Sequence, residues 1–360
     1  MAVVAVVAGV AMAAVVGPVA GGKPATGPTP ANSRAATAVR QGVREFQKGI
    51  AYTGYWHDAY VGPGARRALR RLRDTGATWV QVLVTGYVRT LRSARIVRRA
   101  DATPTDASLR DVIDYAHRLG LKVMLKPHVD IWGSECWRGR IGPGFSEAEW
   151  RAWFASYRSF IVHYARLAEQ TGTELFCVGC ELDGTVHREA EWRAVVARVR
   201  REYSRRITYA DDQIVEDPYA VRWWDAVDLI GMDAYPELTR RLHPTTVQLR
   251  RAWRRWARRL EALSRRWGKP VILTEIGCRS VRGAATAPWD YLRRGPVDLR
   301  VQQRWYAAAF KALVRRPWLV GMYWWQWEPA TPAGGPRDTG YIPYRKPAER
   351  VLRAWYARRL

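Results

Sequence analysis

A unit made of a helix, a glycine and an apolar strand repeats along this chain, and it restricts the folds that the chain can adopt. In four places a glycine ends a polar, amphipathic segment and a run of apolar residues follows within a few positions; these glycines are Gly76, Gly120, Gly172 and Gly268. Glycine readily takes the left-handed conformation that ends a helix. Apolar strands that alternate with amphipathic helices are typical of a parallel sheet covered by helices.

Eight strands of this kind can be placed along the sequence. We predict them over residues 48–53, 78–85, 122–128, 174–181, 207–211, 228–235, 271–276 and 320–327. Helices fill most of the intervals, and residues 347–358 supply the last helix. Eight such units predict a single α/β domain with the closed (β/α)8 architecture of a TIM barrel. An open, doubly wound sheet is the alternative, and the absence of a glycine-rich phosphate-binding fingerprint disfavours it.

The 360 residues divide into three parts by composition. Residues 1–20 are almost wholly apolar and small, which predicts a signal peptide or a membrane anchor, although no basic residue precedes Lys23. Residues 21–47 are rich in Ala, Pro and Thr and predict a linker. Residues 48–360 hold the predicted barrel, in which any catalytic site must lie. We therefore expect a protein that is secreted or anchored at the outer face of the cell membrane.

The net charge of +26 comes mostly from arginine and is spread along most of the predicted helices. In the densest stretch, residues 250–267, apolar residues recur at helical spacing; they are Trp253, Trp256, Leu260, Leu263 and Trp267. This stripe predicts one buried helix face with arginine on the solvent face. No nucleic-acid-binding signature accompanies the charge, so we expect no specific nucleic-acid partner and at most a nonspecific attraction to anionic cell-wall polymer.

Four cysteines are present, and Cys177 and Cys180 form a CxxC pair. Such a pair can indicate a redox or zinc site. This one lies inside an apolar strand, and no second pair stands at zinc spacing, so a packing role is favoured. No metal cage or nucleotide fingerprint is evident, and we predict no metal and no cofactor.

Polar and aromatic residues gather where the predicted strands end, which is where barrel enzymes carry their active sites. Glu181 and Glu275 each follow an apolar strand directly, on the fourth and seventh strands, which lie across a barrel from each other. A facing pair of carboxyl groups predicts glycoside hydrolysis. One group protonates the departing glycosidic oxygen, and the other stabilises or attacks the anomeric carbon. Simple pairing of each glutamate with an arginine is the alternative.

Further strand-end residues are candidates for binding a sugar. We expect Tyr235 to hydrogen-bond Glu275 and to hold it ionised. Either Trp325 or Trp327 can form a platform under a pyranose ring, whereas alternation along the strand turns Trp324 towards the helices. Three residues at the end of the third strand are predicted to bind sugar hydroxyls; they are Lys126, His128 and Asp130.

Several short motifs, in this order and spacing, resemble glycoside hydrolase family 113. They are Lys48-Gly49-Ile50, the segment 125–130, Gly179-Cys180-Glu181-Leu182, the segment 231–235, Thr274-Glu275-Ile276-Gly277 and the tryptophan-rich last strand. The resemblance runs from about Lys48 to the C-terminus and implies a (β/α)8 catalytic domain over residues 48–360. It also implies Glu181 as general acid/base, Glu275 as nucleophile, net retention, and endo-acting cleavage of β-1,4-mannan or manno-oligosaccharides.

One position departs from the pattern that the resemblance implies. The clan of glycosidases to which family 113 belongs usually has Asn before the acid/base, where the Asn hydrogen-bonds the sugar 2-hydroxyl. This chain has Cys180 at that position, and a thiol is a poor hydrogen-bond partner. Either another group makes this contact or the preferred sugar differs. The same mechanism on another β-linked glucan, xylan or wall exopolysaccharide is therefore an alternative. A non-catalytic wall-polysaccharide binding protein is a third hypothesis.

Overall fold

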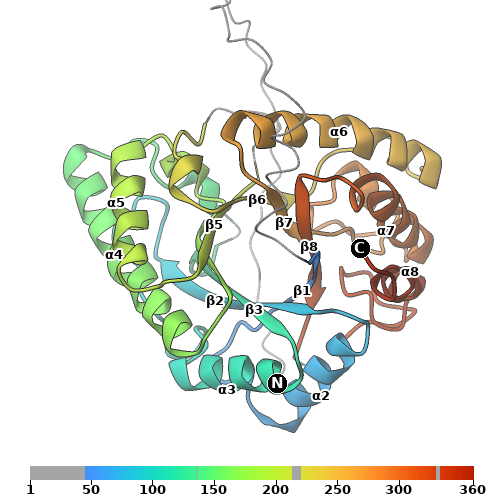
Figure 1. Cartoon of the computed structure of the whole chain (residues 1–360), viewed down its shortest axis with the longest axis horizontal. Helices are drawn as coiled ribbons and strands as arrows, with labels where there is room; N and C mark the ends of the chain where they lie inside the picture. Colours follow the sequence, from blue (N-terminus) through green and yellow to red (C-terminus); the bar gives the residue numbers. More distant parts are fainter. Residues whose placement is uncertain (1–44, 135, 213–219, 330–332) are drawn as a thin grey trace, which may run out of the picture.

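The eight predicted strands form a closed parallel barrel in the computed structural model, which describes residues 45–134, 136–212, 220–329 and 333–360. Each strand pairs with the next one in the chain, and β8 pairs with β1 (Figure 1). The strands are β1 (Gln47–Tyr52), β2 (Trp79–Val88), β3 (Lys122–Ile131), β4 (Leu175–Cys180), β5 (Arg206–Asp211), β6 (Leu229–Ala234), β7 (Val271–Ile276) and β8 (Leu319–Trp327). The predicted fold class is confirmed.

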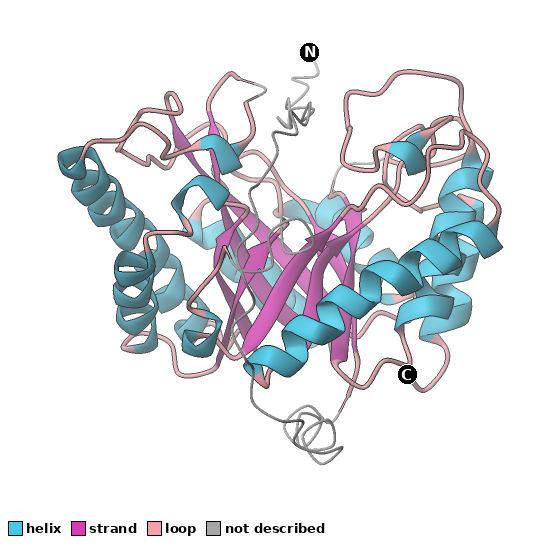
Figure 2. Ribbon diagram, turned by 90° about the horizontal axis from the view of Figure 1, so that it is seen from above, coloured by secondary structure: helices cyan, strands magenta, loops and turns pink. Residues whose placement is uncertain are grey.

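The helices lie outside the barrel and alternate with the strands (Figure 2), except between β5 and β6, where the described residues contain only the short helix η3 (Trp224–Ala226). They are α2 (Gly62–Arg73), α3 (Asp106–Arg118), α4 (Glu147–Gln170), α5 (Glu189–Arg200), α6 (Thr246–Trp267), α7 (Leu299–Leu313) and α8 (Pro347–Tyr356). The four glycines that mark the repeat all have positive φ, and Gly268 is the left-handed cap of α6. Ser146 and Thr245 begin α4 and α6 with capping boxes, which satisfy backbone N–H groups of the first turn.

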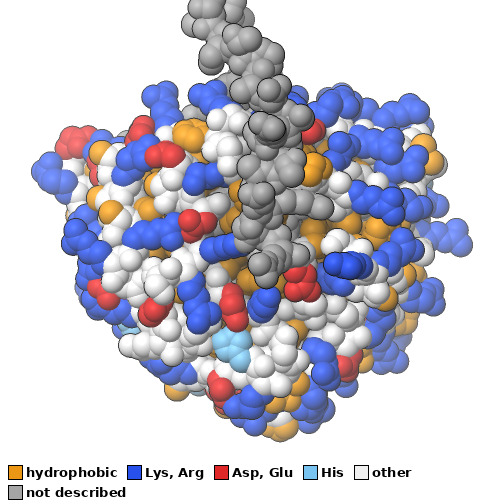
Figure 3. All heavy atoms as spheres, viewed as in Figure 1, with side chains coloured by type: hydrophobic (Ala, Val, Ile, Leu, Met, Phe, Trp, Pro, Cys, Tyr) orange, Lys and Arg blue, Asp and Glu red, His pale blue; other side chains and the backbone are white. Residues whose placement is uncertain are grey.

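Tryptophan fills much of the layer between barrel and helices. Trp253 of α6 packs edge-to-face against Trp305 of α7, with ring centroids 5.3 Å apart, and both are fully buried. The predicted stripe of α6 is confirmed, since its members are buried or partly buried while most arginines of the helix are exposed. Lysine and arginine side chains are spread over the visible face of the molecule (Figure 3).

A register shift divides β8 into two parts. Ile50 of β1 pairs with Trp324, but Tyr52 pairs with Trp327, so β8 contains one extra residue between these pairs. A bulge of this kind breaks the alternation of side chains between the two faces of a strand. Trp324 points outwards as predicted, where it stacks on Tyr306 of α7 at a centroid distance of 3.7 Å. The bulge decides the orientation of the later β8 tryptophans.

The predicted signal peptide or anchor over residues 1–20, and nearly all of the predicted linker over residues 21–47, lie outside the described residues. Within the described ranges, no helix combines the length and the apolar character that crossing a membrane requires.

Candidate active site

A buried network of Lys126, Asp233 and Glu275 lies at the carboxyl ends of β3, β6 and β7. The Lys126 Nζ donates to both oxygens of Asp233 at 2.8 Å and to Oε1 of Glu275 at 2.6 Å. The Lys126 side chain is fully buried. The prediction that Lys126 binds sugar hydroxyls is therefore wrong, because its ammonium group is enclosed and is shared between two carboxylates.

Glu275 is held from two directions. Besides the bond from Lys126, its Oε2 accepts a hydrogen bond of 2.8 Å from the phenol of Tyr235, as the sequence predicted. Only 4% of Glu275 is exposed. The pKa of Glu275 is raised to about 8, first by burial and then by the charge of Asp233, while the charge of Lys126 opposes both effects. The carboxyl group thus carries two donors that favour its anionic form in a site that disfavours charge.

Glu181 follows directly after β4 and has a left-handed backbone, with φ of 50°. Residues with a Cβ adopt this conformation rarely, and such strain is concentrated at functional sites. The Glu181 Oε2 accepts hydrogen bonds from Nη1 of Arg138 at 2.8 Å and from the indole of Trp137 at 3.2 Å. Burial raises the pKa of Glu181, and the charge of Arg138 opposes this shift.

Arg138 and Trp137 are site residues that the sequence analysis missed. Arg138 begins the short helix η1 (Arg138–Arg140), and its guanidinium also donates to Oδ1 of Asp130 through Nε at 2.8 Å and Nη2 at 2.6 Å. Asp130, predicted to bind a sugar hydroxyl, therefore positions the arginine that contacts Glu181. Neither missed residue ends a strand, and nothing in the sequence distinguishes Arg138 among 59 basic residues.

The thiol of Cys180 lies close to both glutamates. Cys180 is 1% exposed, and its Sγ donates to Oδ2 of Asp233 at 3.3 Å. One carboxyl oxygen of Glu181 and one of Glu275 each lie within 4.8 Å of this sulfur atom. Glu181, which follows β4, and Glu275, in β7, therefore both lie near one sulfur atom. The predicted packing role agrees with the buried position of Cys177, whose Sγ donates to the carbonyl of Gly179. It does not account for Cys180, which also contacts the carboxylate of Asp233.

His128 lies beside Glu275 and is 3% exposed. Its Nε2 is 3.8 Å from Oε1 of Glu275, too far for a hydrogen bond, and it has no hydrogen-bond partner among the described residues. Burial and the charges of Arg138 and Lys126 lower the pKa of His128 well below its usual range. The imidazole is consequently neutral and presents an unused polar atom to the site.

Trp325 is on the same side of the barrel wall as these groups. Its indole is parallel to the ring of His128, with centroids 6.5 Å apart, and it packs with Tyr341 near Tyr235. Trp325 is 9% exposed. Of the two tryptophans considered for a sugar platform, this is the one that lies beside Glu275 and His128.

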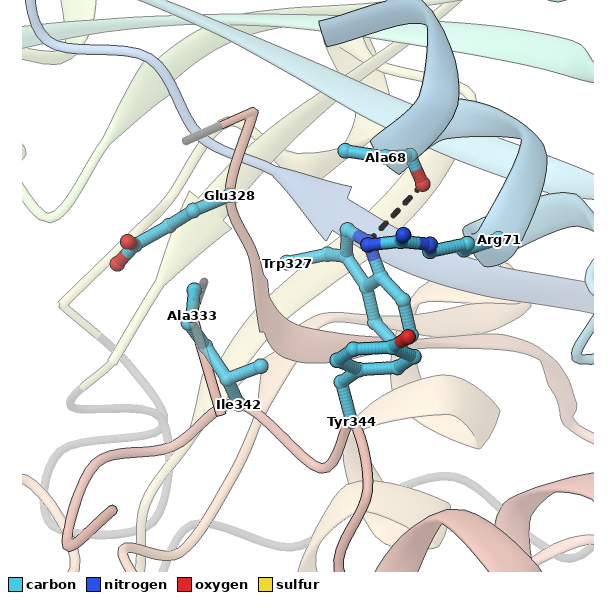
Figure 4. A pocket seen from close by; sticks show the side chains of 7 residues that line it. All are labelled: Ala68, Arg71, Trp327, Glu328, Ala333, Ile342 and Tyr344. Carbon is cyan, nitrogen blue, oxygen red and sulfur yellow. Dashed lines mark hydrogen bonds between the residues drawn. The ribbon is translucent and has the colours of Figure 1, made fainter. Parts of the chain in front are cut away.

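Trp327 faces the opposite side of the wall, so its predicted role as a platform is wrong. Its Nε1 donates to the carbonyl of Ala68 in α2 at 3.0 Å, and its ring packs against Tyr344 (Figure 4). These residues enclose a small cavity of about 10 Å³, about the space of one water molecule. The bulge in β8 explains the error, because it places Trp327 on the same face as Trp324.

The site carries excess negative charge. Four carboxyl groups converge on two cationic side chains; the carboxyl groups belong to Asp130, Glu181, Asp233 and Glu275, and the cations are Lys126 and Arg138. Full ionisation would leave two negative charges unbalanced in a buried site. The raised pKa of Glu181 and that of Glu275 follow first from burial and then from the neighbouring negative charges. Carboxyl groups with raised pKa values are suited to acid/base chemistry near neutral pH.

The profile of Glycoside Hydrolase Family 113 matches residues 51–346. A complex structure of a GH113 β-1,4-mannanase has a TM-score of 0.79 and 31% identity, and the match covers 88% of this chain and 100% of that chain. A further structure of a GH113 β-1,4-mannanase has a TM-score of 0.78 and 32% identity, with coverage of 88% and 100%.

The GH113 β-mannanase AaManA from Alicyclobacillus acidocaldarius, in complex with ManMIm, has a TM-score of 0.77 and 34% identity, and the match covers 87% of this chain and 97% of that chain. A comparison with curated proteins gave no match. The family profile covers most of the predicted barrel domain and both glutamates. This chain is therefore a glycoside hydrolase that belongs to Glycoside Hydrolase Family 113.

Proposed function

We propose that this protein is a retaining, endo-acting hydrolase of β-1,4-mannan or manno-oligosaccharides. The observation that carries the proposal is the convergence of Glu181 and Glu275, from β4 and β7, on the sulfur atom of Cys180. Two carboxyl groups in one sugar-sized space are what double displacement at an anomeric carbon needs. The three similar structures are β-mannanases by their descriptions, which supports mannan as the substrate.

In the first step Glu275 is the nucleophile and Glu181 the acid. A carboxylate oxygen of Glu275 forms a bond to the anomeric carbon, the glycosidic C–O bond breaks, and the carboxyl proton of Glu181 passes to the leaving oxygen. Before attack, Lys126 and Tyr235 stabilise the anionic form of Glu275. In the second step Glu181 takes a proton from water, whose oxygen displaces Glu275 from the anomeric carbon.

The charge balance of the site explains how Glu181 serves both as acid and as base. An ionised Glu275 disfavours a second negative charge nearby, so Glu181 keeps its proton before the first step. Ester formation removes the charge of Glu275 but leaves Lys126 and Arg138 in place. The pKa of Glu181 then falls, because a repelling anion has gone while the cations remain. Glu181 is thereby ionised when water must be activated.

Arg138 is our candidate for the contact that Cys180 does not make. The Nη1 of Arg138 lies 3.5 Å from the sulfur of Cys180 while it donates to Glu181 at 2.8 Å. It therefore places a strong donor next to the side chain that stands where the clan has Asn. We propose that Arg138 donates to the sugar 2-hydroxyl from this side. Contacts to this hydroxyl strengthen in the transition state and contribute several kcal/mol.

Product analysis tests the substrate and the mode of cleavage. Mannopentaose and cellopentaose are incubated side by side with the protein, and the products are followed over time. Preferential, internal cleavage of mannopentaose is the expected result. Faster cleavage of cellopentaose would move the proposal to the alternative in which the mechanism acts on another β-linked polymer. The absence of turnover on every β-linked polysaccharide would favour the non-catalytic hypothesis.

Two further measurements test the mechanism. Proton NMR of the first-formed product should show the β-anomer, and an α-anomer would exclude retention. A 2-deoxy-2-fluoro-β-mannosyl donor with a good leaving group should form a stable ester on the enzyme. Peptide mass spectrometry should place the ester on Glu275, and an ester on another residue would overturn the assigned nucleophile.

Export and attraction to anionic wall polymer remain proposals. The apolar composition of residues 1–20 supports export, and the net charge of +26 supports nonspecific attraction to polyanions. Fractionation of producing cells tests the first proposal. Release of the protein from isolated cell walls by moderate salt tests the second.

A further inference from the structure

We propose that the barrel mouth binds a thiophilic divalent cation such as Zn²⁺ through His128, Cys180 and Glu275, and that this cation inhibits the enzyme. The imidazole nitrogen, the sulfur and a carboxyl oxygen of these residues lie within 4.8 Å of one another. Nitrogen, sulfur and oxygen donors in this combination are characteristic of zinc sites. A ligand shell of three protein groups leaves a fourth position for water.

An unsatisfied polar atom points to the same site independently. The Nε2 of His128 has no hydrogen-bond partner among the described residues, and only 3% of the residue is exposed. Buried polar atoms without partners are uncommon in folded proteins, and each costs about 1–3 kcal/mol. The nearest acidic oxygen, Oε1 of Glu275, is 3.8 Å away. A metal ion between these two atoms would give the His128 nitrogen the partner that it lacks.

The electrostatics of the barrel mouth favour a divalent cation. With all carboxyl groups ionised, the ion pairs of Lys126 and Arg138 leave two negative charges unbalanced. Cys180 and a further pair of acidic groups, Glu181 and Asp233, also lie within 4.8 Å of one another, so the thiol is surrounded by anionic oxygens. The ammonium group of Lys126, 2.6 Å from Glu275, competes with the metal, so binding is weaker than in a structural zinc site.

Binding is coupled to loss of a proton. The metal ligand is the thiolate, whereas the free thiol of Cys180 donates its proton to Asp233. Metal binding must therefore release the thiol proton, and the affinity should rise with pH. This dependence distinguishes the site from simple attraction of a cation to carboxylates.

Cys180 supplies the thiolate of the proposed site. An amide at this position would be a poor ligand for Zn²⁺ compared with a thiolate. No metal site could be predicted from the sequence, because the three ligands stand on β3, β4 and β7 and no two of them have a recognisable spacing. The fold alone brings them together.

Occupancy of the site would block hydrolysis. The cation would engage the carboxylate that we assign as nucleophile, so inhibition should be reversible by chelators and should compete with sugar binding. The inhibitory consequence rests on the proposed function, but the binding itself does not. Metal binding is therefore measured without sugar.

Cobalt is a suitable probe, since Co²⁺ replaces Zn²⁺ and thiolate ligation produces a charge-transfer absorption in the near ultraviolet. Titration of the metal-free full-length protein with CoCl₂ should give this band with a stoichiometry of one, and added ZnCl₂ should remove it. Cys180→Ser should abolish the band and weaken Zn²⁺ binding in calorimetry by at least about 100-fold, more than loss of an outer partner of a metal ligand.

Cys136→Ser is the matched control, because Cys136 is the partly exposed cysteine and lies outside the proposed ligand set. It should retain the band. Cys180→Asn provides a second variant at the ligand position if Cys180→Ser does not fold, and it should lack the band and be insensitive to zinc. A band that persists in folded Cys180→Ser or Cys180→Asn would overturn the proposal, as would the absence of any thiolate band in the wild-type protein.

Discussion

The phenol of Tyr235 donates a hydrogen bond of 2.8 Å to Oε2 of Glu275, on the carboxyl oxygen that Lys126 does not contact. Tyr235→Phe removes this donor and should raise the pKa of Glu275, because the bond favours the ionised form. Since Glu275 must be ionised to attack, the acid limb of the pH profile of kcat/KM should move to higher pH. A hydrogen bond of ordinary strength corresponds to roughly 0.5–1 pH unit.

Tyr341→Phe is the control for this shift. Tyr341 lies against Tyr235, but its hydroxyl donates to the carbonyl of Pro288 and not to Glu275. Its acid limb should stay in place. An unchanged acid limb in Tyr235→Phe would mean that this phenol does not control the ionisation of Glu275.

Replacing either central glutamate by glutamine should lower kcat by about 10²–10⁴-fold, the range that proton transfer by a positioned group contributes. Both substitutions preserve shape, so circular dichroism should show an intact fold. Glu328→Gln is the control, because Glu328 follows a barrel strand but bonds only to Gln326 in the described structure. Near wild-type turnover in Glu181→Gln or Glu275→Gln would contradict the assigned chemistry.

The left-handed backbone at Glu181 predicts an effect on stability. Glu181→Ala and Glu181→Gly both remove the carboxylate, but only glycine relieves the strain at a φ of 50°. The glycine variant should therefore be the more stable of the two by about 1 kcal/mol. Urea unfolding of both proteins measures this difference. Equal stability, or a more stable alanine variant, would show that the backbone is unstrained at this position.

Arg138→Met should move the alkaline limb of the kcat/KM profile to higher pH. The charge of Arg138 lowers the pKa of Glu181, so its removal lets the acid keep its proton to higher pH. Arg138→Lys retains the charge but loses the planar fork that joins Asp130 to Glu181, so kcat should fall while the limb moves less. If the alkaline limb stayed at its wild-type pH in both variants, Arg138 would not control the titration of Glu181.

Trp325 and Trp327 should give contrasting variants. Trp325→Phe should raise KM for manno-oligosaccharides, because the smaller ring beside His128 offers less stacking area to a sugar. Trp327→Phe should lower the free energy of unfolding by about 1 kcal/mol, since its hydrogen bond to Ala68 is lost, with little change in KM. A raised KM in the Trp327 variant together with an unchanged KM in the Trp325 variant would contradict the orientation of these two side chains on β8.

The barrel was predictable because its signal is local and repeated. Glycines such as Gly76 and Gly268 end helices, an apolar strand follows, and each predicted strand lies within three residues of an observed one. The two glutamates were predictable for the same reason, since each ends a strand and every strand of a parallel barrel ends at the same rim.

The rest of the site depends on features that a single sequence does not encode locally. Trp327 was misplaced because the bulge in β8 is visible only in the pairing with β1. Lys126 does stand near the end of its strand, as the sequence predicted. The sequence does not show that its ammonium group is enclosed by Asp233 and Glu275, and the predicted contact with sugar hydroxyls was therefore wrong. Arg138 begins η1 in the connection between β3 and α4, and its guanidinium reaches Glu181. The path of such a connection follows from tertiary contacts, which a single sequence does not show.

The strained backbone at Glu181 also bears on how the chain can evolve. If selection for catalysis lapses, the first tolerated replacements at this position should be residues that accept a left-handed conformation, chiefly Gly and Asn. Such changes remove the acid while they relax the fold, so natural descendants can lose activity without losing solubility or abundance. Descendants that have lost activity should therefore be intact barrels, and substitution at position 181 should be among their earliest changes.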